Sequence, residues 1–191
     1  MRAPFACVLS LSLALAACSG SPPQKELDRA QGAIDAARAA GAEIYAAEAY
    51  RAATSSLQQA HDAVTQSDYR LALTRALDAH DRAQEAARGA ADGKAHARSE
   101  AEAALTAAGA AVQRLHTRLT TESARVPKNA MPGLKKYAAT ADETLQKARA
   151  SLNTGGYLDA RDSARALTTE VNERITALDL SSMPKASRRR R

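Results

Sequence analysis

The sequence predicts an all-α protein built from antiparallel helical hairpins. Alanine supplies 48 of the 191 residues, whereas Val, Ile, Phe and Trp number 5, 3, 1 and none. Alanine is the best intrinsic helix former, and the scarcity of β-branched and aromatic residues argues against a sheet. Apolar residues recur every three or four positions, and no proline interrupts residues 24–126. Because alanine buries little area, these helices should enclose a thin core.

The first helical region covers residues 24–90. We expect a first helix from about 23 to 40, which Gly41 ends, and a second from about 45 to 65. A turn at residues 66–68 separates the second helix from a third that starts near Tyr69. Each helix places a stripe of small or aliphatic residues on one face, and in the first helix this stripe is Leu27, Ala30, Ile34 and Ala37.

The apolar stripe of the third helix continues in phase across Gly89 and Gly93. Alanine recurs at every seventh position from 76 to 111. Because loops rarely preserve such a phase, we expect one helix to about Ser123, roughly 80 Å long at 1.5 Å per residue. The alternative is a loop at residues 89–94, since two glycines cost about 2 kcal/mol of helix propensity.

The second helical region covers residues 91–180 and repeats part of the first. Prolines at 127 and 132 predict a break from residue 126 to 133, after which a fourth helix begins. Gly155 and Gly156 turn the chain into a fifth helix, which ends near Ser181. At an offset of 88 residues the two hairpins align, pairing Leu57 with Leu145, Gln58 with Gln146, and Tyr69 with Tyr157. We therefore predict a duplicated hairpin joined by one long helix, a bundle with coiled-coil spacing.

Residues 1–17 have the form of a secretory signal peptide. Arg2 precedes an apolar run from Phe5 to Ala17, which is shorter than the roughly 20 residues that span a bilayer. The run ends in the sequence Leu-Ala-Ala-Cys at residues 15–18, and residues 18–23 form a flexible spacer rich in Ser, Gly and Pro. The plain alternative is a signal peptide cut near Ala17 with an incidental cysteine.

The four residues 15–18 resemble the lipobox of bacterial lipoproteins. This resemblance implies cleavage before Cys18 and acylation, with palmitate among the lipids, of its sulfur and amino group. Ser19 stands where an Asp would favour the inner membrane, so the resemblance implies a lipid anchor on the periplasmic face of the outer membrane. Three acyl chains anchor a protein essentially permanently. Because Cys7 would leave with the signal, the mature chain would hold no free thiol and no disulfide.

The net charge of +6 lies almost entirely at the C-terminus. Residues 18–184 hold as many basic as acidic groups, so residues 181–191 are expected to form a disordered basic tail. The tail either only solubilises the chain or contacts an anionic phospholipid, lipopolysaccharide or cell-wall polymer. Basic residues do not cluster with aromatics as in nucleic-acid-binding folds, so we expect no nucleic-acid partner. The tail cations are Lys185, Arg188, Arg189, Arg190 and Arg191.

No residue pattern predicts catalysis, a cofactor or a metal site. The four histidines, at 61, 80, 96 and 116, show no HxxxH or ExxH spacing and no Cys/His cluster. Neither a Gly-x-Ser-x-Gly elbow nor a phosphate-binding glycine loop occurs. We therefore predict that the protein is not an enzyme and has surface histidines. An incompletely covered stripe on the long helix would suit a partner helix or self-association.

Residues 33–42, with Tyr45-Ala46 and Asp68-Tyr69-x-x-Ala72, resemble a domain of unknown function in small helical envelope lipoproteins. Some members of that family carry an OmpA-like peptidoglycan-binding domain, of which this sequence has no pattern, so cell-wall binding is not implied. The turn from Ser67 also resembles the inter-helix turn of tetratricopeptide repeats. We expect the protein to be a periplasm-facing scaffold, spacer or adaptor with an envelope partner. The alternative is a module that binds an anionic polymer or lipid through its basic tail.

Overall fold

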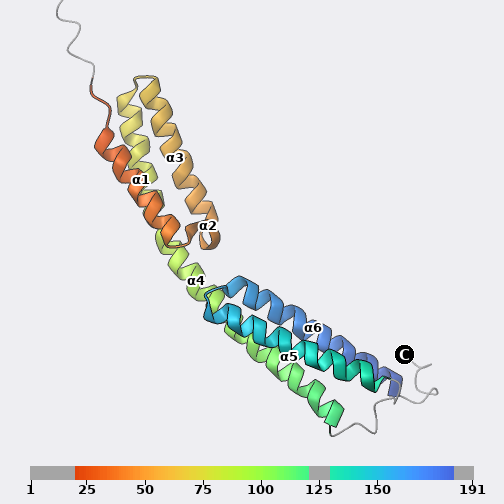
Figure 1. Cartoon of the computed structure of the whole chain (residues 1–191). Helices are drawn as coiled ribbons and strands as arrows, with labels where there is room; N and C mark the ends of the chain where they lie inside the picture. Colours follow the sequence, from red (N-terminus) through yellow and green to blue (C-terminus); the bar gives the residue numbers. More distant parts are fainter. Residues whose placement is uncertain (1–19, 121–129, 183–191) are drawn as a thin grey trace, which may run out of the picture. The chain divides into compact units, whose positions relative to one another are not determined.

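The computed structural model describes residues 20–120 and 130–182, and every regular element among them is a helix (Figure 1). The predicted all-α fold, with a duplicated hairpin joined by one long helix, is confirmed. The helices are α1 (Gln24–Ala39), α2 (Ala42–Tyr45), α3 (Ala47–Thr65), α4 (Tyr69–Thr120), α5 (Met131–Asn153) and α6 (Tyr157–Ser182).

The helices form two compact units, which meet in sequence between Ala91 and Asp92. Unit 1, residues 20–91, contains α1, α2, α3 and the first part of α4. Unit 2, residues 92–120 and 130–182, contains the rest of α4 with α5 and α6. Helix α4 is therefore the third long helix of unit 1 and the first of unit 2, so each predicted hairpin is completed to three helices.

Helix α4 is unbroken through both glycines, as predicted. Ala90 and Ala97 are both buried, so the apolar stripe keeps its phase across Gly93. At Gly89 an added Cβ would lie 3.4 Å from the Cβ of Ala46, which is ordinary packing distance. The predicted end of this helix near Ser123 lies outside the described residues.

The two units align in burial as well as in sequence. At the offset of 88, three buried residues of α3 match three of α5, and four of α4 match four of α6. At an offset of 81, the buried residues 27, 30 and 34 of α1 match 108, 111 and 115 of α4. The two offsets differ by seven residues, so the connection that enters α5 is one heptad longer than the one that enters α3. The aligned pairs are 53/141, 57/145, 60/148, 72/160, 76/164, 79/167 and 83/171.

Both hairpin turns close with the same hydrogen bonds. The N–H of Ser67 donates to the carbonyl of Val64 at 2.9 Å, and the N–H of Asp68 donates to that of Ala63 at 2.9 Å. In unit 2 the N–H groups of Gly155 and Gly156 make the equivalent bonds, at 3.1 and 2.8 Å. This is the Schellman motif, which needs one left-handed residue. Ser67, at φ 61°, occupies the place that Gly155 takes at φ 87°.

Two predicted boundaries are wrong. The helix expected from about 45 to 65 is interrupted at Ala46, whose φ of −142° is not helical, so the short α2 precedes α3. The break expected to last through residue 133 ends earlier, because α5 begins at Met131 and contains Pro132 and Gly133. Proline is tolerated in the first turn of a helix, where its missing N–H has no intrahelical partner. Residues 126–129 of that break lie outside the described residues.

Candidate functional site

All the site residues that the sequence predicts lie outside the described residues. Cys18 belongs to residues 1–19, and the tail cations Lys185, Arg188, Arg189, Arg190 and Arg191 belong to residues 183–191. Gly20 is the described residue nearest in sequence to Cys18. The surroundings of Gly20 therefore locate the end of unit 1 at which the predicted lipid would be attached.

The chain after Gly20 passes over the start of α4. An added Cβ at Gly20 would lie 3.8 Å from Cδ2 of Tyr69, so this spacer residue packs at the first turn of α4. The N–H of Gln24 then donates to the carbonyl of Pro22 at 2.8 Å, and α1 follows. At the same end Asp68 caps α4, accepting a 2.9 Å hydrogen bond from the N–H of Leu71. The spacer, the hairpin turn and the first turn of α4 therefore form one end of unit 1.

An apolar stripe begins at this end. Tyr69, Leu73 and Leu77 succeed one another at four-residue steps and so share one side of α4. We call these three residues the Leu73 stripe. Tyr69 is partly buried, but Leu73 is 38% and Leu77 44% exposed. The exposure of Leu73 and Leu77 was not predicted from the sequence, although two leucines beside an all-alanine stripe were a signal for it.

The flank of α4 opposite the Leu73 stripe carries a polar contact with α3. The hydroxyl of Ser56, 5% exposed, donates to Oδ2 of Asp78 at 2.7 Å, and Nε of Arg82 donates to both oxygens of Asp78 at 2.9 Å. Hydrogen bonds from Arg82, then from Ser56, hold the pKa of the Asp78 carboxyl below its ordinary value. An ionised carboxylate whose lone pairs are occupied in this way connects helices rather than acting as a base.

Unit 2 has an ionic cluster between α4 and α6. Nη1 of Arg161 lies 3.0 Å from Oε2 of Glu100, and Nη2 of Arg165 lies 3.5 Å from Oε1. The hydrogen bond from Arg161 holds the pKa of the Glu100 carboxyl below its ordinary value. Arg161 and Arg165 are the repeat equivalents of Leu73 and Leu77 at the offset of 88. A hollow of about 560 Å³ adjoins the cluster, lined by Glu100, Ala103, Ala104, Ala107, Arg165, Thr168 and Thr169.

A histidine pairs with a carboxylate between α4 and α5. Nε2 of His116 lies 2.9 Å from Oδ2 of Asp142. Both side chains are partly exposed, at 39% and 49%. Among residues 20–120 and 130–182, His, Cys, Asp and Glu side chains form no group of three or more that could hold a metal ion. The sequence could not reveal this pair, because its members are 26 residues apart on different helices.

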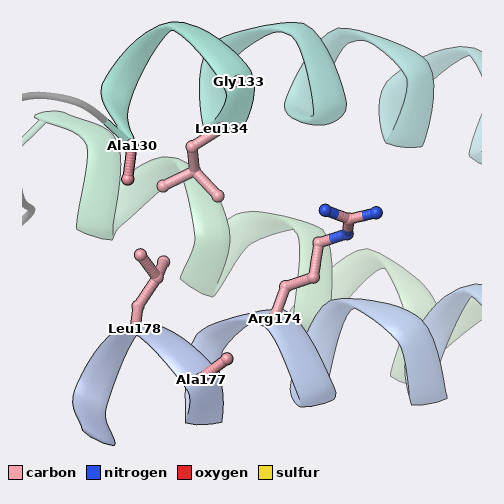
Figure 2. A pocket seen from close by; sticks show the side chains of 6 residues that line it. All are labelled: Ala130, Gly133, Leu134, Arg174, Ala177 and Leu178. Atoms are coloured by element: carbon pink, nitrogen blue, oxygen red, sulfur yellow. The ribbon is translucent and has the colours of Figure 1, made fainter. Parts of the chain in front are cut away.

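A second hollow, of about 280 Å³, opens between α5 and α6 (Figure 2). Leu134 and Leu178 extend toward each other across it, and the Arg174 side chain rises from α6 beside them. The guanidinium carbon of Arg174 lies 4.0 Å from the centroid of the Tyr137 ring. Burial is the largest influence on Tyr137 and raises the pKa of its hydroxyl. The lining presents one cation, already stacked on an aromatic ring, and aliphatic groups, so it assembles no acid–base pair.

Comparison of the chain with protein-family models, with curated proteins and with solved structures finds no match. The resemblance to envelope lipoproteins and the tetratricopeptide-like turn therefore stay predictions. Across the described ranges 20–120 and 130–182, no helix combines the length and the apolar character that a membrane span requires.

Proposed function

We propose that this chain is a non-catalytic lipoprotein of the bacterial cell envelope, anchored through Cys18 on the periplasmic face of the outer membrane. In this role it is a scaffold, spacer or adaptor. The observation that carries the proposal is the sequence at residues 15–18, which ends an apolar run of lipoprotein length and directly precedes the spacer into α1. A structure of packed alanine-rich helices supports it, because such helices offer rigid length and faces for other helices.

The decisive test is metabolic labelling with an alkyne analogue of palmitate. We expect the label on the wild-type chain and its complete loss in Cys18→Ala, with release of that variant from the membrane fraction. Cys7→Ala is the matched control, since it removes the other cysteine but lies within the leader, and it should keep the label. A wild-type chain that carries no label would contradict the anchor.

The membrane that receives the chain is tested separately by density fractionation. The wild-type chain should sediment with the outer membrane. Ser19→Asp should move it to the inner membrane, because the resemblance makes residue 19 the sorting position. If Ser19→Asp does not change the membrane in which the chain is found, the outer-membrane assignment is contradicted, whereas lipid anchoring is not.

A second function rests on the C-terminal charge. Five cations among the last seven residues, beside a balanced remainder, favour contact with an anionic lipid, lipopolysaccharide or wall polymer. Deletion of residues 185–191 should then lower retention on envelope fractions, most strongly at low salt, where charges are least screened. Retention equal to that of the wild type at every salt concentration would indicate that the tail only solubilises the chain.

A further inference from the structure

The Leu73 stripe lies beside the start of α1, where the first helix of unit 1 is shorter than that of unit 2. In unit 2 the first helix extends past the equivalent positions and places Glu100 against Arg161 and Arg165. At the offset of 81 that aligns the two first helices, Glu100 corresponds to residue 19, which precedes the start of α1 at Gln24. Pro22 and Pro23 stand directly before α1, and proline supplies no N–H to extend a helix backwards beyond its first turn.

Gly20 sets how far a lipid at Cys18 can lie from this stripe. The two residues from Cys18 to Gly20 span at most about 7 Å, at up to about 3.6 Å per residue. Since Gly20 packs on Tyr69, an acylated Cys18 brings the bilayer surface to the first turn of α4. Helices that lie in a membrane interface bury their apolar faces about 5–10 Å deep, and the reach of about 7 Å from Gly20 to Cys18 falls within this range.

The chemistry of the stripe matches the interface of a bilayer. Tyrosine is enriched at the headgroup level, where its ring is buried and its hydroxyl stays wet, and leucine partitions into the acyl region. Residues 20–30 and 66–77, which form this end of unit 1, carry four basic and three acidic side chains. Because these charges almost balance, the contact that the end can make with a membrane is apolar and does not require anionic lipid.

We propose that Tyr69, Leu73 and Leu77 form a second membrane contact, resting in the interface of the bilayer that holds Cys18. This proposal rests on the proposed lipid anchor. The acyl chains hold the protein at the membrane, and the stripe fixes the orientation of unit 1 against it. The shortened α1, the leucines in place of Arg161 and Arg165, and the position of Gly20 each serve this contact.

The test uses the lipidated full chain in phosphatidylcholine vesicles that contain nitroxide-bearing lipids. Apart from Cys18, the predicted mature chain has no cysteine, so Arg70→Cys provides one site for a fluorescent probe. Arg51→Cys is the matched control, because it removes the same residue type from an exposed position about 20 Å away along α3. We expect lipid quenching about threefold stronger at residue 70 than at residue 51, unchanged at high salt.

A second variant separates the stripe from the anchor. Leu73→Gln with Leu77→Gln, added to Arg70→Cys, should reduce quenching at residue 70 toward the level at residue 51, with helicity by circular dichroism unchanged. Quenching that these substitutions leave unchanged would assign it to the anchor alone and overturn the contact. Equal quenching at residues 70 and 51 in a chain that carries the palmitate label overturns the contact and leaves the anchor standing. Absence of the label overturns both. Energy transfer between chains at residue 70, without lipid quenching, overturns the contact by placing a second copy on the stripe.

Discussion

The two units share one helical plan but fill it with different side chains. In unit 1 every buried residue that α4 contributes is alanine, at positions 72, 76, 79, 83, 86 and 90. In unit 2 the equivalent helix α6 begins its buried stripe with Ala160 and Ala164 but continues it with Leu167 and Val171. Alanine allows close helix approach at the cost of buried area, whereas leucine and valine bury more area per contact. The two units therefore bury equivalent positions but fill them with side chains of different volume.

The larger core side chains are distributed accordingly. Unit 1 relies on Leu27, Ile34, Tyr50 and Leu57 from α1 and α3. Unit 2 has larger side chains on all three of its helices, namely Leu105, Val112, Leu115, Leu134, Leu145, Leu167 and Val171. We therefore expect unit 1 to open at a lower free energy than unit 2.

The largest effect is expected from truncating a large, fully buried aliphatic side chain in each unit. Ile34 and Leu115 occupy equivalent positions and are 2% and 0% exposed. Ile34→Ala and Leu115→Ala should each cost about 2–5 kcal/mol of unfolding free energy. Unit 1 has fewer other large side chains in its core. Ile34→Ala should therefore abolish the hydrogen-exchange protection of the unit 1 amides, whereas Leu115→Ala should leave unit 2 folded. Equal loss of protection in both units would contradict the ranking.

The next effect tests packing at Ala79, whose equivalent in unit 2 is Leu167. Ala79 is fully buried, so Ala79→Leu overfills unit 1 and should cost about 1–3 kcal/mol. Ala52→Leu is the control, a substitution of the same size on the less buried part of α3. Denaturant unfolding measures both, and an Ala79→Leu variant as stable as wild type would show that the alanine stripe does not bring α4 close to its neighbours.

A smaller effect is expected at the two Schellman turns. Ser67 holds a left-handed conformation that costs a residue with a side chain about 1–2 kcal/mol. Ser67→Gly should therefore raise the thermal midpoint of unit 1, while Gly155→Ser should lower that of unit 2 by a similar free energy. The two substitutions exchange the residues of one turn for those of the other. Shifts of the same sign would contradict the equivalence of the turns.

The smallest effect is the loss of inter-helix ionic contacts in acid. The pKa values of Glu100 and Asp78 are lowered on folding, from ordinary values of 4.5 and 3.8, so their contribution is complete above those values. It is lost as pH falls through the lower, folded values. Stability should therefore begin to decrease as pH falls below about 4.5, and Glu100→Gln should flatten this dependence for α6 amides, as Asp78→Asn should for α3 amides. Identical pH profiles for wild type and variants would exclude these contacts.

The sequence revealed the helices and the duplication because both depend on local properties. Periodicity placed the stripes on α1, α3 and α4, and the phase across Gly89 and Gly93 predicted one continuous helix. The turn at residues 66–68 was readable from its polar residues, and its match at 155–156 from the two glycines.

Other features of the described residues were not predicted from the sequence. The interruption at Ala46 has no signal in the residue itself, because alanine favours helix. Pro132 was read as a break because proline stops a helix interior, but it lies in a first turn, where it is permitted. The contact between Glu100 and Arg161 joins residues 61 apart on different helices.

The alanine stripe of α4 also bears on how unit 1 responds to temperature. The heat capacity change of unfolding rises with the apolar area that unfolding exposes, and a core of methyl groups exposes little. A smaller heat capacity change gives a flatter curve of free energy against temperature, which falls less steeply toward both cold and heat. Unit 1 should therefore have a lower maximum stability than unit 2. Its free energy of unfolding should also vary less with temperature, on both the cold and the warm side of that maximum.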